Sequence, residues 1–204
     1  MTRFKGRTAL ITAAGSGVGL GAALRLAAEG AAVTIWDRDK TALAGAVEQA
    51  AAAGVILTVV ALDMTDGAAV DDAVARFVAE NRRIDVLVNN IGGSLHTPFR
   101  FLEQSDQDWG CVMSVNVTAC VRTTRNVLPH MIAQDYGRVI NMGSKAGRFG
   151  SLFAGANYTC AFRRIRPPIP TAFAHSYRTI RPPVTRCVEA QGLGISCFVF
   201  RHLF

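Results

Sequence analysis

The stretch that most constrains the fold of this chain is Thr-Ala-Ala-Gly-Ser-Gly-Val-Gly, at residues 12–19. It follows a short apolar run, residues 8–12, and precedes a helix-like pattern over residues 20–29. A strand that leads through a glycine-rich turn into a helix directs bare backbone amides and the positive end of the helix dipole at one point. That arrangement binds a diphosphate, whereas glycines alone mark any turn. The sequence therefore predicts a phosphate-binding loop here, with an ordinary turn as the alternative.

Short apolar runs and helix-like stretches alternate along the first four-fifths of the chain. The strand-like runs are residues 9–12, 32–36, 55–62, 84–88 and 138–142. The helix-like stretches are residues 20–29, 40–53, 68–80 and 108–131. Apolar strands that alternate with helices form a parallel sheet covered on both faces. We therefore expect an α/β fold, a Rossmann-type doubly wound parallel sheet in three α/β/α layers.

Composition narrows the class of protein further. The chain has 204 residues, half of them hydrophobic, which is enough for one domain with a substantial core. No apolar run approaches the ~20 residues that a membrane-spanning helix needs. The first seven residues contain no apolar signal segment, so we expect a cytoplasmic protein. The five cysteines have neither metal-ligand spacing nor a Cys-x-x-Cys pair, so we expect reduced thiols and no metal site.

The net charge of +7 is concentrated in the last fifth of the chain. Residues 1–162 contain 15 basic and 14 acidic side chains, whereas residues 163–204 contain seven arginines and one acid, Glu189. Nucleic acid as a partner of this tail is one hypothesis, but we do not expect it, because no nucleic-acid-binding module is recognisable. We divide the chain into a nucleotide-binding domain with active-site motifs, 1–162, and an atypical arginine- and proline-rich segment, 163–204.

Prolines interrupt the alternation of strands and helices after residue 162. Arg-Pro-Pro occurs twice there, at residues 166–168 and 181–183. Proline removes a backbone donor and pushes the residue before it out of the helical region. A helix that starts near Asn157 should therefore not pass Ile165, and residues 194–200 offer one further strand. We expect the fold to be truncated or irregular in this part.

Five motifs resemble those of the short-chain dehydrogenase/reductase family. The glycine-rich loop is similar to the family's Thr-Gly-x-x-x-Gly-x-Gly, with Gly17 and Gly19 matching. The other matches are Asn89-Asn90-Ile91-Gly92, Asn116 in a Val-Asn-Val context, Ser144 after an apolar strand, and Tyr158. Motifs that occur in the family's order are stronger evidence together than any one of them alone. The resemblance extends from the first strand to about Cys160.

The resemblance implies an NAD(P) site built at the ends of four strands. It assigns coenzyme binding to Thr12, Gly15, Ser16, Gly17, Val18, Gly19, Asp37, Asp63, Met64, Asn90 and Gly92. For Asn90 and Gly92, a turn that ends the fourth strand is equally compatible with these residue types. Asp63 is similar to the family's adenine-contacting aspartate, with a helix N-cap as the alternative.

Asp37 bears on the choice of coenzyme. It ends the second strand, 18 residues beyond Gly19. A carboxylate there accepts hydrogen bonds from ribose hydroxyls and repels a 2′-phosphate, so NAD is expected and NADP is less favoured. The neighbouring Arg38 tolerates a phosphate, which weakens this preference. The alternative role for Asp37 is to start a turn.

The resemblance also implies three catalytic residues, Ser144, Tyr158 and Asn116. The Tyr158 hydroxyl would give or take the substrate proton while the nicotinamide carries the hydride, and Ser144 would hold the substrate oxygen. Asn116 would support the site. Simpler alternatives are a strand-end cap for Ser144, a surface position on an amphipathic helix for Tyr158, and a helix residue bonded to its own backbone for Asn116.

Two positions depart from the family's pattern. Ala13 replaces the first glycine of the loop, which is costly if its φ is positive. Phe162 replaces the lysine four residues after the tyrosine, whose ammonium holds the ribose and lowers the pKa of the tyrosine. We therefore expect severely impaired catalysis. A shifted reading frame or altered gene end from about residue 161 would explain the change of composition, and an insertion over residues 163–183 is the alternative.

The expected function follows from the family. We expect an oxidoreductase that transfers a hydride between a nicotinamide coenzyme and a secondary alcohol or ketone, similar to 3-oxoacyl reductases or alcohol dehydrogenases. The alternative is an NAD-binding scaffold or sensor without catalysis. Relatives usually pair through the helices that carry Asn116 and Tyr158, so a homo-oligomer is expected if both helices are intact.

Overall fold

The computed structural model describes residues 2–144, 146–149, 155–164 and 195–198. Its strands are β1 (Thr8–Thr12), β2 (Ala32–Asp37), β3 (Leu57–Ala61), β4 (Val86–Asn89), β5 (Arg138–Met142) and β6 (Ile195–Phe198). Its α-helices are α1 (Gly17–Ala28), α2 (Lys40–Ala52), α3 (Gly67–Asn81), α4 (Asp106–Met113), α5 (Ala119–Ala133), α6 (Ala146–Phe149) and α7 (Ala156–Arg164). A 3₁₀ turn, η1 (Phe101–Glu103), precedes α4, and a π-turn, η2 (Ser114–Thr118), joins α4 to α5. Within these ranges, no helix is both long and apolar enough to cross a membrane.

The strands form one sheet in the order β3-β2-β1-β4-β5-β6. All pairs among β1–β5 are parallel, with Leu10 of β1 opposite Thr34 on one side and Leu87 on the other. The chain extends the sheet from β1 to β3 and then returns to place β4 beside β1, which is the doubly wound topology. The predicted fold class is therefore confirmed. β6 lies within the further strand expected near the end of the chain, and it adds an antiparallel edge beside β5.

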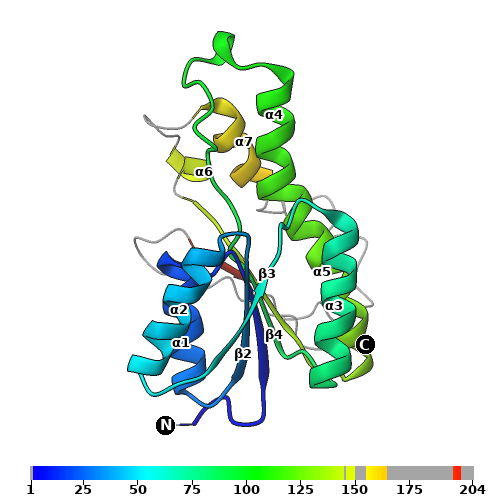
Figure 1. Cartoon of the computed structure of the whole chain (residues 1–204). Coiled ribbons are helices and arrows are strands. Elements are labelled where there is room, and N and C mark those ends of the chain that lie inside the picture. Colours follow the sequence, from blue (N-terminus) through cyan, green and yellow to red (C-terminus); the bar gives the residue numbers. More distant parts are fainter. Residues whose placement is uncertain (1, 145, 150–154, 165–194, 199–204) are drawn as a thin grey trace.

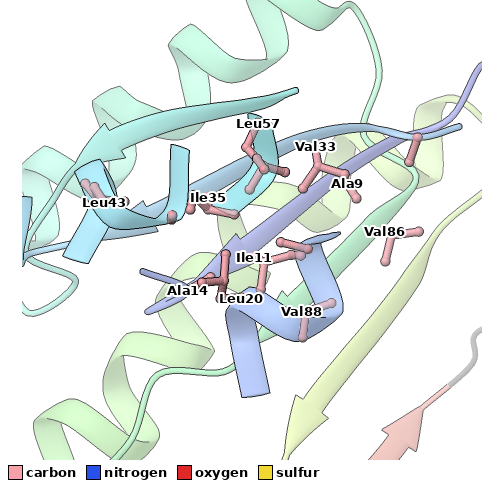
Figure 2. Packing of buried hydrophobic residues seen from close by; sticks show 14 residues of the cluster. Ala9, Ile11, Ala14, Leu20, Val33, Ile35, Leu43, Leu57, Val86 and Val88 are labelled. Atoms are coloured by element: carbon pink, nitrogen blue, oxygen red, sulfur yellow. The ribbon is translucent and has the colours of Figure 1, made fainter. Parts of the chain in front are cut away.

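Helices cover both faces of the sheet (Figure 1). α1 and α2 pack on one face, and α3 and α5 pack on the other. Successive residues of β1 alternate between the two cores, since Ala9 and Ile11 belong to the first and Leu10 to the second. Figure 2 shows the first core, where Leu20 of α1 and Leu43 of α2 pack on the strands. Burial on both faces explains why the strands are continuous apolar runs.

Side chains fix the starting points of three helices. Asp39 accepts hydrogen bonds from two backbone amides at the start of α2, and Asp66 accepts one at the start of α3. Ser105 and Asp108 form a reciprocal capping box at the start of α4. Each cap satisfies amides that have no partner within the helix.

The helix predicted over residues 108–131 contains the π-turn η2, in which the buried Asn116 lies. The Asn116 side-chain amide donates to the carbonyl of Val112, 2.8 Å away and four residues earlier. A side-chain donor that takes a helical carbonyl competes with the backbone amide for it and favours a wider turn. The long helix predicted over residues 108–131 is therefore present as the continuous run of α4, η2 and α5, with a wider turn at Asn116.

A buried carboxylate, Asp85, holds the amino-terminal edge of the sheet together. It accepts hydrogen bonds from the guanidinium groups of Arg7 at 2.8 Å and Arg83 at 2.6 Å, and from the Thr8 amide at 2.9 Å. Arg7 also stacks on Tyr136, 3.9 Å from the ring centre. Burial raises the pKa of Asp85, but the hydrogen bonds from Arg83, Thr8 and Arg7 outweigh it, so the pKa is lowered. The starts of β1 and β4 are thus joined through an ionised side chain.

Replacing Asp85 tests how much this edge contributes to stability. We expect Asp85→Asn to lower the free energy of unfolding by about 3 kcal/mol, because two guanidinium groups lose a buried counter-ion. Urea denaturation measures the loss, with the exposed Asp72 of α3 changed to asparagine as a matched control that should leave stability nearly unchanged.

The same pair of proteins tests the pH dependence. Because the pKa of folded Asp85 lies below the ordinary value of 3.8, its stabilisation is present above that pH and is lost as the pH falls below it. The stability difference between wild type and Asp85→Asn should therefore shrink on acidification. A constant difference down to the acid limit of folding would contradict this account.

Candidate active site

The loops that carry the predicted site residues meet at the carboxyl edge of the sheet. β1 and β4 are neighbours in the sheet, although β2 and β3 lie between them in the chain. At such a switch point the loops lead to opposite faces of the sheet, and ligands bind between them. All predicted coenzyme residues end or follow β1, β2, β3 or β4. The topology therefore collects them at one edge.

Thr12 joins the loop after β1 to the loop after β4. Its buried hydroxyl accepts hydrogen bonds from the backbone amides of Asn90 at 3.1 Å and Ile91 at 3.2 Å. The hydroxyl also lies 3.4 Å from the carbonyl of Val88, to which it donates. These backbone groups lie where the ladder between β1 and β4 ends, and one side chain satisfies them. Thr12 thus supports the glycine-rich loop from behind.

The glycine-rich loop leaves the start of α1 open. Ser16, Gly17 and Val18 are exposed, and the Ser16 side chain makes no capping hydrogen bond. The first turn of α1 contains no acidic residue. α2, α3 and α4 differ in this respect, since each begins with a side-chain cap. The backbone amides at the start of α1 are therefore available to an anion, which the helix dipole also favours.

Asn90 fixes the same loop through its side chain. Its amide donates to the Ala13 carbonyl, 2.7 Å away. It also packs on Gly19, where an added Cβ would lie 2.5 Å from the Asn90 side-chain nitrogen, so a larger residue would disrupt this contact. Ala13 has a φ of 50°, the left-handed conformation that side chains disfavour. Because the φ of Ala13 is positive, alanine in place of the family's glycine destabilises the loop, as the sequence predicted for this case.

Asp37 connects the end of β2 to the glycine-rich loop. One carboxylate oxygen accepts the Gly15 amide at 2.9 Å, and the other accepts the Asp39 amide at 3.0 Å. The second contact is the turn-starting role that the sequence left open as an alternative. Each carboxylate oxygen has two acceptor directions, so Asp37 keeps capacity for further donors. A coenzyme role for Asp37 and its turn role are thus compatible.

Asp63 and Met64 follow β3 and differ in exposure. Asp63 is exposed and accepts hydrogen bonds from the Thr65 amide at 2.8 Å and hydroxyl at 2.7 Å, which lower the pKa of Asp63. Asp66, not Asp63, caps α3. The N-cap alternative for Asp63 is therefore wrong, because a local turn takes its carboxylate and the helix begins three residues later. The Met64 side chain is buried in the core beside α3.

Asn116 holds the segment that follows β4. Its side chain is fully buried, and it pairs with Gly93 in both directions, accepting from the amide at 2.9 Å and donating to the carbonyl at 2.9 Å. Its bond to Val112 is the alternative role that the sequence left open, so both interactions are present. Gly92, one residue earlier, is exposed. Asn116 therefore fixes the backbone beside the Asn90 turn.

Ser144 and Tyr158 lie beyond β5. Ser144 is half-buried two residues after the strand, and its hydroxyl accepts the Ala146 amide at 3.1 Å, as the strand-end alternative expects. Tyr158 is half-buried in the first turn of α7. Its backbone amide donates to the Asn157 side chain at 2.7 Å. That the two hydroxyls meet at one point stays a prediction, as do the catalytic roles. The side chain of Phe162 lies outside the described residues.

Two polar residues without a predicted role join the loop after β4 to the start of α7. The Asn157 amide donates to the Thr97 hydroxyl at 3.1 Å. An asparagine in the first helical turn, where free amides need acceptors, is a signal that favours such a role for Asn157. Thr97 carries no local signal, because its partner lies 60 residues away in the chain.

Known proteins share this sequence pattern. The model of the short chain dehydrogenase family matches residues 7–161. The 3-oxoacyl-[acyl-carrier-protein] reductase of Thermotoga maritima is 34% identical over 149 residues, which are 73% of this chain and 60% of that protein. This chain spans about three-fifths of the length of the curated relatives that it matches first.

Solved structures share the fold. An NAD⁺-bound xylitol dehydrogenase has a TM-score of 0.74 and 33% identity, covering 80% of this chain and 62% of the other. A variant of actinorhodin polyketide ketoreductase with NADPH has a TM-score of 0.72 and 31% identity, covering 78% of this chain and 60% of the other. With the family motifs, the doubly wound sheet and these matches together, this chain belongs to the short-chain dehydrogenase family of oxidoreductases.

Proposed function

We propose that this chain binds a nicotinamide coenzyme and transfers a hydride between it and a secondary alcohol or ketone. The observation that carries the proposal is the uncapped start of α1 at the switch point between β1 and β4. The relatives named above reduce a 3-oxoacyl group or a polyketide, or dehydrogenate xylitol, by their names. A carbon that alternates between alcohol and ketone is common to these names, and we propose it for this chain by analogy.

The residues at the carboxyl edge fit a dinucleotide. The backbone amides of the exposed residues Ser16, Gly17 and Val18 would hold the diphosphate. Gly15 and Gly19 leave no room for a side chain, because an added Cβ would lie 2.8 Å from Ala42 and 2.5 Å from Asn90, respectively. Asp37 and Asp63 would accept hydrogen bonds from the adenosine part of the coenzyme. The Met64 side chain is buried in the core, so Met64 would contact the coenzyme through its backbone. Asn90 and Gly92 follow β4 and would flank the nicotinamide end. Thr12 would act through the loop that it supports.

NAD is the coenzyme that we propose, with NADP less favoured. Asp37 is half-buried and held by two backbone amides, so its negative charge is fixed next to the glycine-rich loop. Arg38 is exposed, and its charge acts on Asp63 after β3, where it helps to lower the pKa of that carboxyl. A fixed carboxylate repels the 2′-phosphate of NADP more strongly than an exposed cation attracts it. The two structural relatives hold NAD⁺ in one case and NADPH in the other.

The chain's own groups would handle the proton and the substrate oxygen. A bound nicotinamide supplies the hydride chemistry. The Tyr158 hydroxyl would give the substrate oxygen its proton or take it away. The Ser144 hydroxyl would donate to the same oxygen, where negative charge develops. Asn116 would keep the segment after β4 in place through its two bonds to Gly93.

We further propose that turnover is impaired. Phe162 lies in α7, four residues after Tyr158, where the family resemblance implies a lysine. An unaided tyrosine has a pKa of ~10, and lowering it to ~7 requires about 4 kcal/mol of interaction with a charge. Phenylalanine offers none. The missing charge at this position favours the second candidate function, a coenzyme-binding protein without catalysis.

Calorimetric titration with NADH and NADPH tests the coenzyme site. We expect NADH to bind about tenfold more tightly, because the Asp37 charge opposes the 2′-phosphate. Asp37→Asn keeps an acceptor for the Gly15 amide but removes the charge, and it should reduce the preference to about twofold. Asp39→Asn is the matched control, since asparagine also caps α2. Equal binding of both coenzymes by wild type would sink the NAD preference, and no heat with either would sink the site.

Ala13→Gly tests the strain in the loop. Glycine adopts a positive φ without penalty, so we expect the free energy of unfolding to rise by about 1 kcal/mol. Ala14→Gly is the matched control: Ala14 is buried and has an ordinary φ, so its variant should be less stable than wild type. Thermal or urea unfolding measures both. If both variants lose stability, Ala13 is not strained in the protein.

Phe162→Lys tests the cause of impaired turnover. We expect NADH oxidation with a panel of ketones to be weak in wild type and to rise at least about tenfold in the variant, because an ammonium lowers the pKa of the tyrosine. Phe162→Met, which adds no charge, is the control and should stay weak. Rapid turnover by wild type would refute the impairment, and binding without turnover in every variant would favour the non-catalytic function.

A further inference from the structure

The turn Ser94–Thr97 after β4 holds two bulky residues in an unfavourable conformation. Leu95 and His96 both have a φ of 54°. The Thr97 amide donates to the Ser94 carbonyl at 3.2 Å and closes the turn. Consecutive left-handed residues are typical of turns built from asparagine and glycine, whereas leucine is rarely found in one. Such a conformation persists only where neighbouring contacts impose it.

Two asparagines from different helices hold the ends of this turn. Asn116 of η2 pairs with the amide and carbonyl of Gly93, directly before the turn. Asn157 of α7 donates to the hydroxyl of Thr97, the last residue of the turn. Both asparagines are fully buried, where a lost hydrogen bond is costly. The strained turn is thus held at both ends, and one of its supports is on the helix that carries Tyr158.

The Asn157 side chain connects the turn directly to Tyr158. Its nitrogen donates to the Thr97 hydroxyl, while its oxygen accepts the backbone amide of Tyr158 at 2.7 Å. This amide belongs to the first turn of α7, where amides have no partner within the helix. One planar amide group therefore joins the turn to the backbone of Tyr158. A displacement of Thr97 would be passed to that backbone.

A second contact brings the same two segments together. The Gln104 side chain donates to the Pro98 carbonyl at 2.8 Å and packs on Gly155, just before α7. A Cβ at Gly155 would lie 1.9 Å from the Gln104 nitrogen and 2.8 Å from the Pro98 carbonyl, so no side chain fits between them. In Figure 1 the segment after β4 passes beside α6 and α7. The start of α7 is therefore packed on this segment at two points.

We propose that Asn157 is a positioning residue, which sets the place of the Tyr158 hydroxyl by tying α7 to the strained turn through Thr97. The catalytic meaning of this coupling rests on the proposed function of Tyr158, whereas the coupling itself does not. Leu95 and His96 are the two central residues of this turn, so a group that contacts them would also affect the position of Tyr158. The conformation of the turn and the position of Tyr158 are therefore coupled.

Fluorine NMR of the full chain labelled with fluorotyrosine tests the coupling. The chain has three tyrosines, Tyr136, Tyr158 and Tyr177, and Tyr158→Phe identifies the signal of Tyr158. Thr97→Val keeps the shape but removes the hydroxyl, with its bond to Asn157 and its bond to the Ser94 carbonyl inside the turn. We expect this variant to shift the Tyr158 signal by more than its linewidth or to split it. Tyr136 lies beside Arg7 at the amino-terminal edge of the sheet, so its signal should not move.

Two further variants separate positioning from general destabilisation. Thr97→Ser keeps the hydroxyl and should retain the wild-type signal. Thr8→Val removes another buried threonine hydroxyl, which donates to the Arg83 carbonyl at 2.9 Å at the amino-terminal edge, and should leave Tyr158 unchanged. Asn157→Ala should reproduce the effect of Thr97→Val. A wild-type Tyr158 signal in folded Thr97→Val overturns the proposal, whether or not Asn157→Ala folds.

Coenzyme titration distinguishes this failure from failure of the proposed function. If wild type binds neither NADH nor NADPH, the function fails, while the tyrosine signals still answer the question of coupling. Where turnover is measurable, Thr97→Val should lower kcat about tenfold and leave the KM for the coenzyme nearly unchanged, because it misplaces the proton donor and not the diphosphate loop. A change in KM alone would contradict a role in positioning Tyr158.

Discussion

The loss of hydrogen-bond partners where β1 and β4 end is the constraint on which this site depends. Parallel strands satisfy each other's backbone only as far as the ladder extends. Beyond it, the Thr12 hydroxyl receives two amides of the loop after β4, and the Asn90 amide reaches the carbonyl of Ala13. Further along, Asn116 takes over both backbone groups of Gly93. Short polar side chains thus continue the sheet's bonding into the loops and hold them in fixed shapes.

Much of the fold was predictable because its causes are local. Strands buried on both faces are continuous apolar runs, and each of the five predicted ones lies within two residues of its observed place. For the same reason the glycine-rich loop could be located from its neighbours, and Asn116 and Asp37 from their motifs. At both of these residues the structural alternative is present: Asn116 bonds to its own helix and also to Gly93, and Asp37 starts a turn and also holds Gly15. Their catalytic and coenzyme roles stay predictions.

The features that sequence reasoning missed depend on distant contacts or on backbone angles. The Asp63 carboxylate accepts a hydrogen bond within its own turn, and Asp66 caps α3 instead. Composition does not resolve which of two nearby carboxylates caps a helix. The π-turn follows from where one side chain donates. The strained turn before Thr97 is held by a residue 60 positions away, and no periodicity contains that information. Secondary-structure propensity describes single segments of the chain, whereas these features depend on contacts between pairs of residues.

The uncapped start of α1 has a consequence for the lifetime of the protein. The other long helices that begin in loops carry their caps within the chain, whereas α1 leaves its free amides to whatever anion occupies them. A molecule that binds there completes the helix as well as the site, and its free energy of binding adds to that of folding. The abundance of such a molecule in the cell would then set how often α1 frays and how readily proteases reach it.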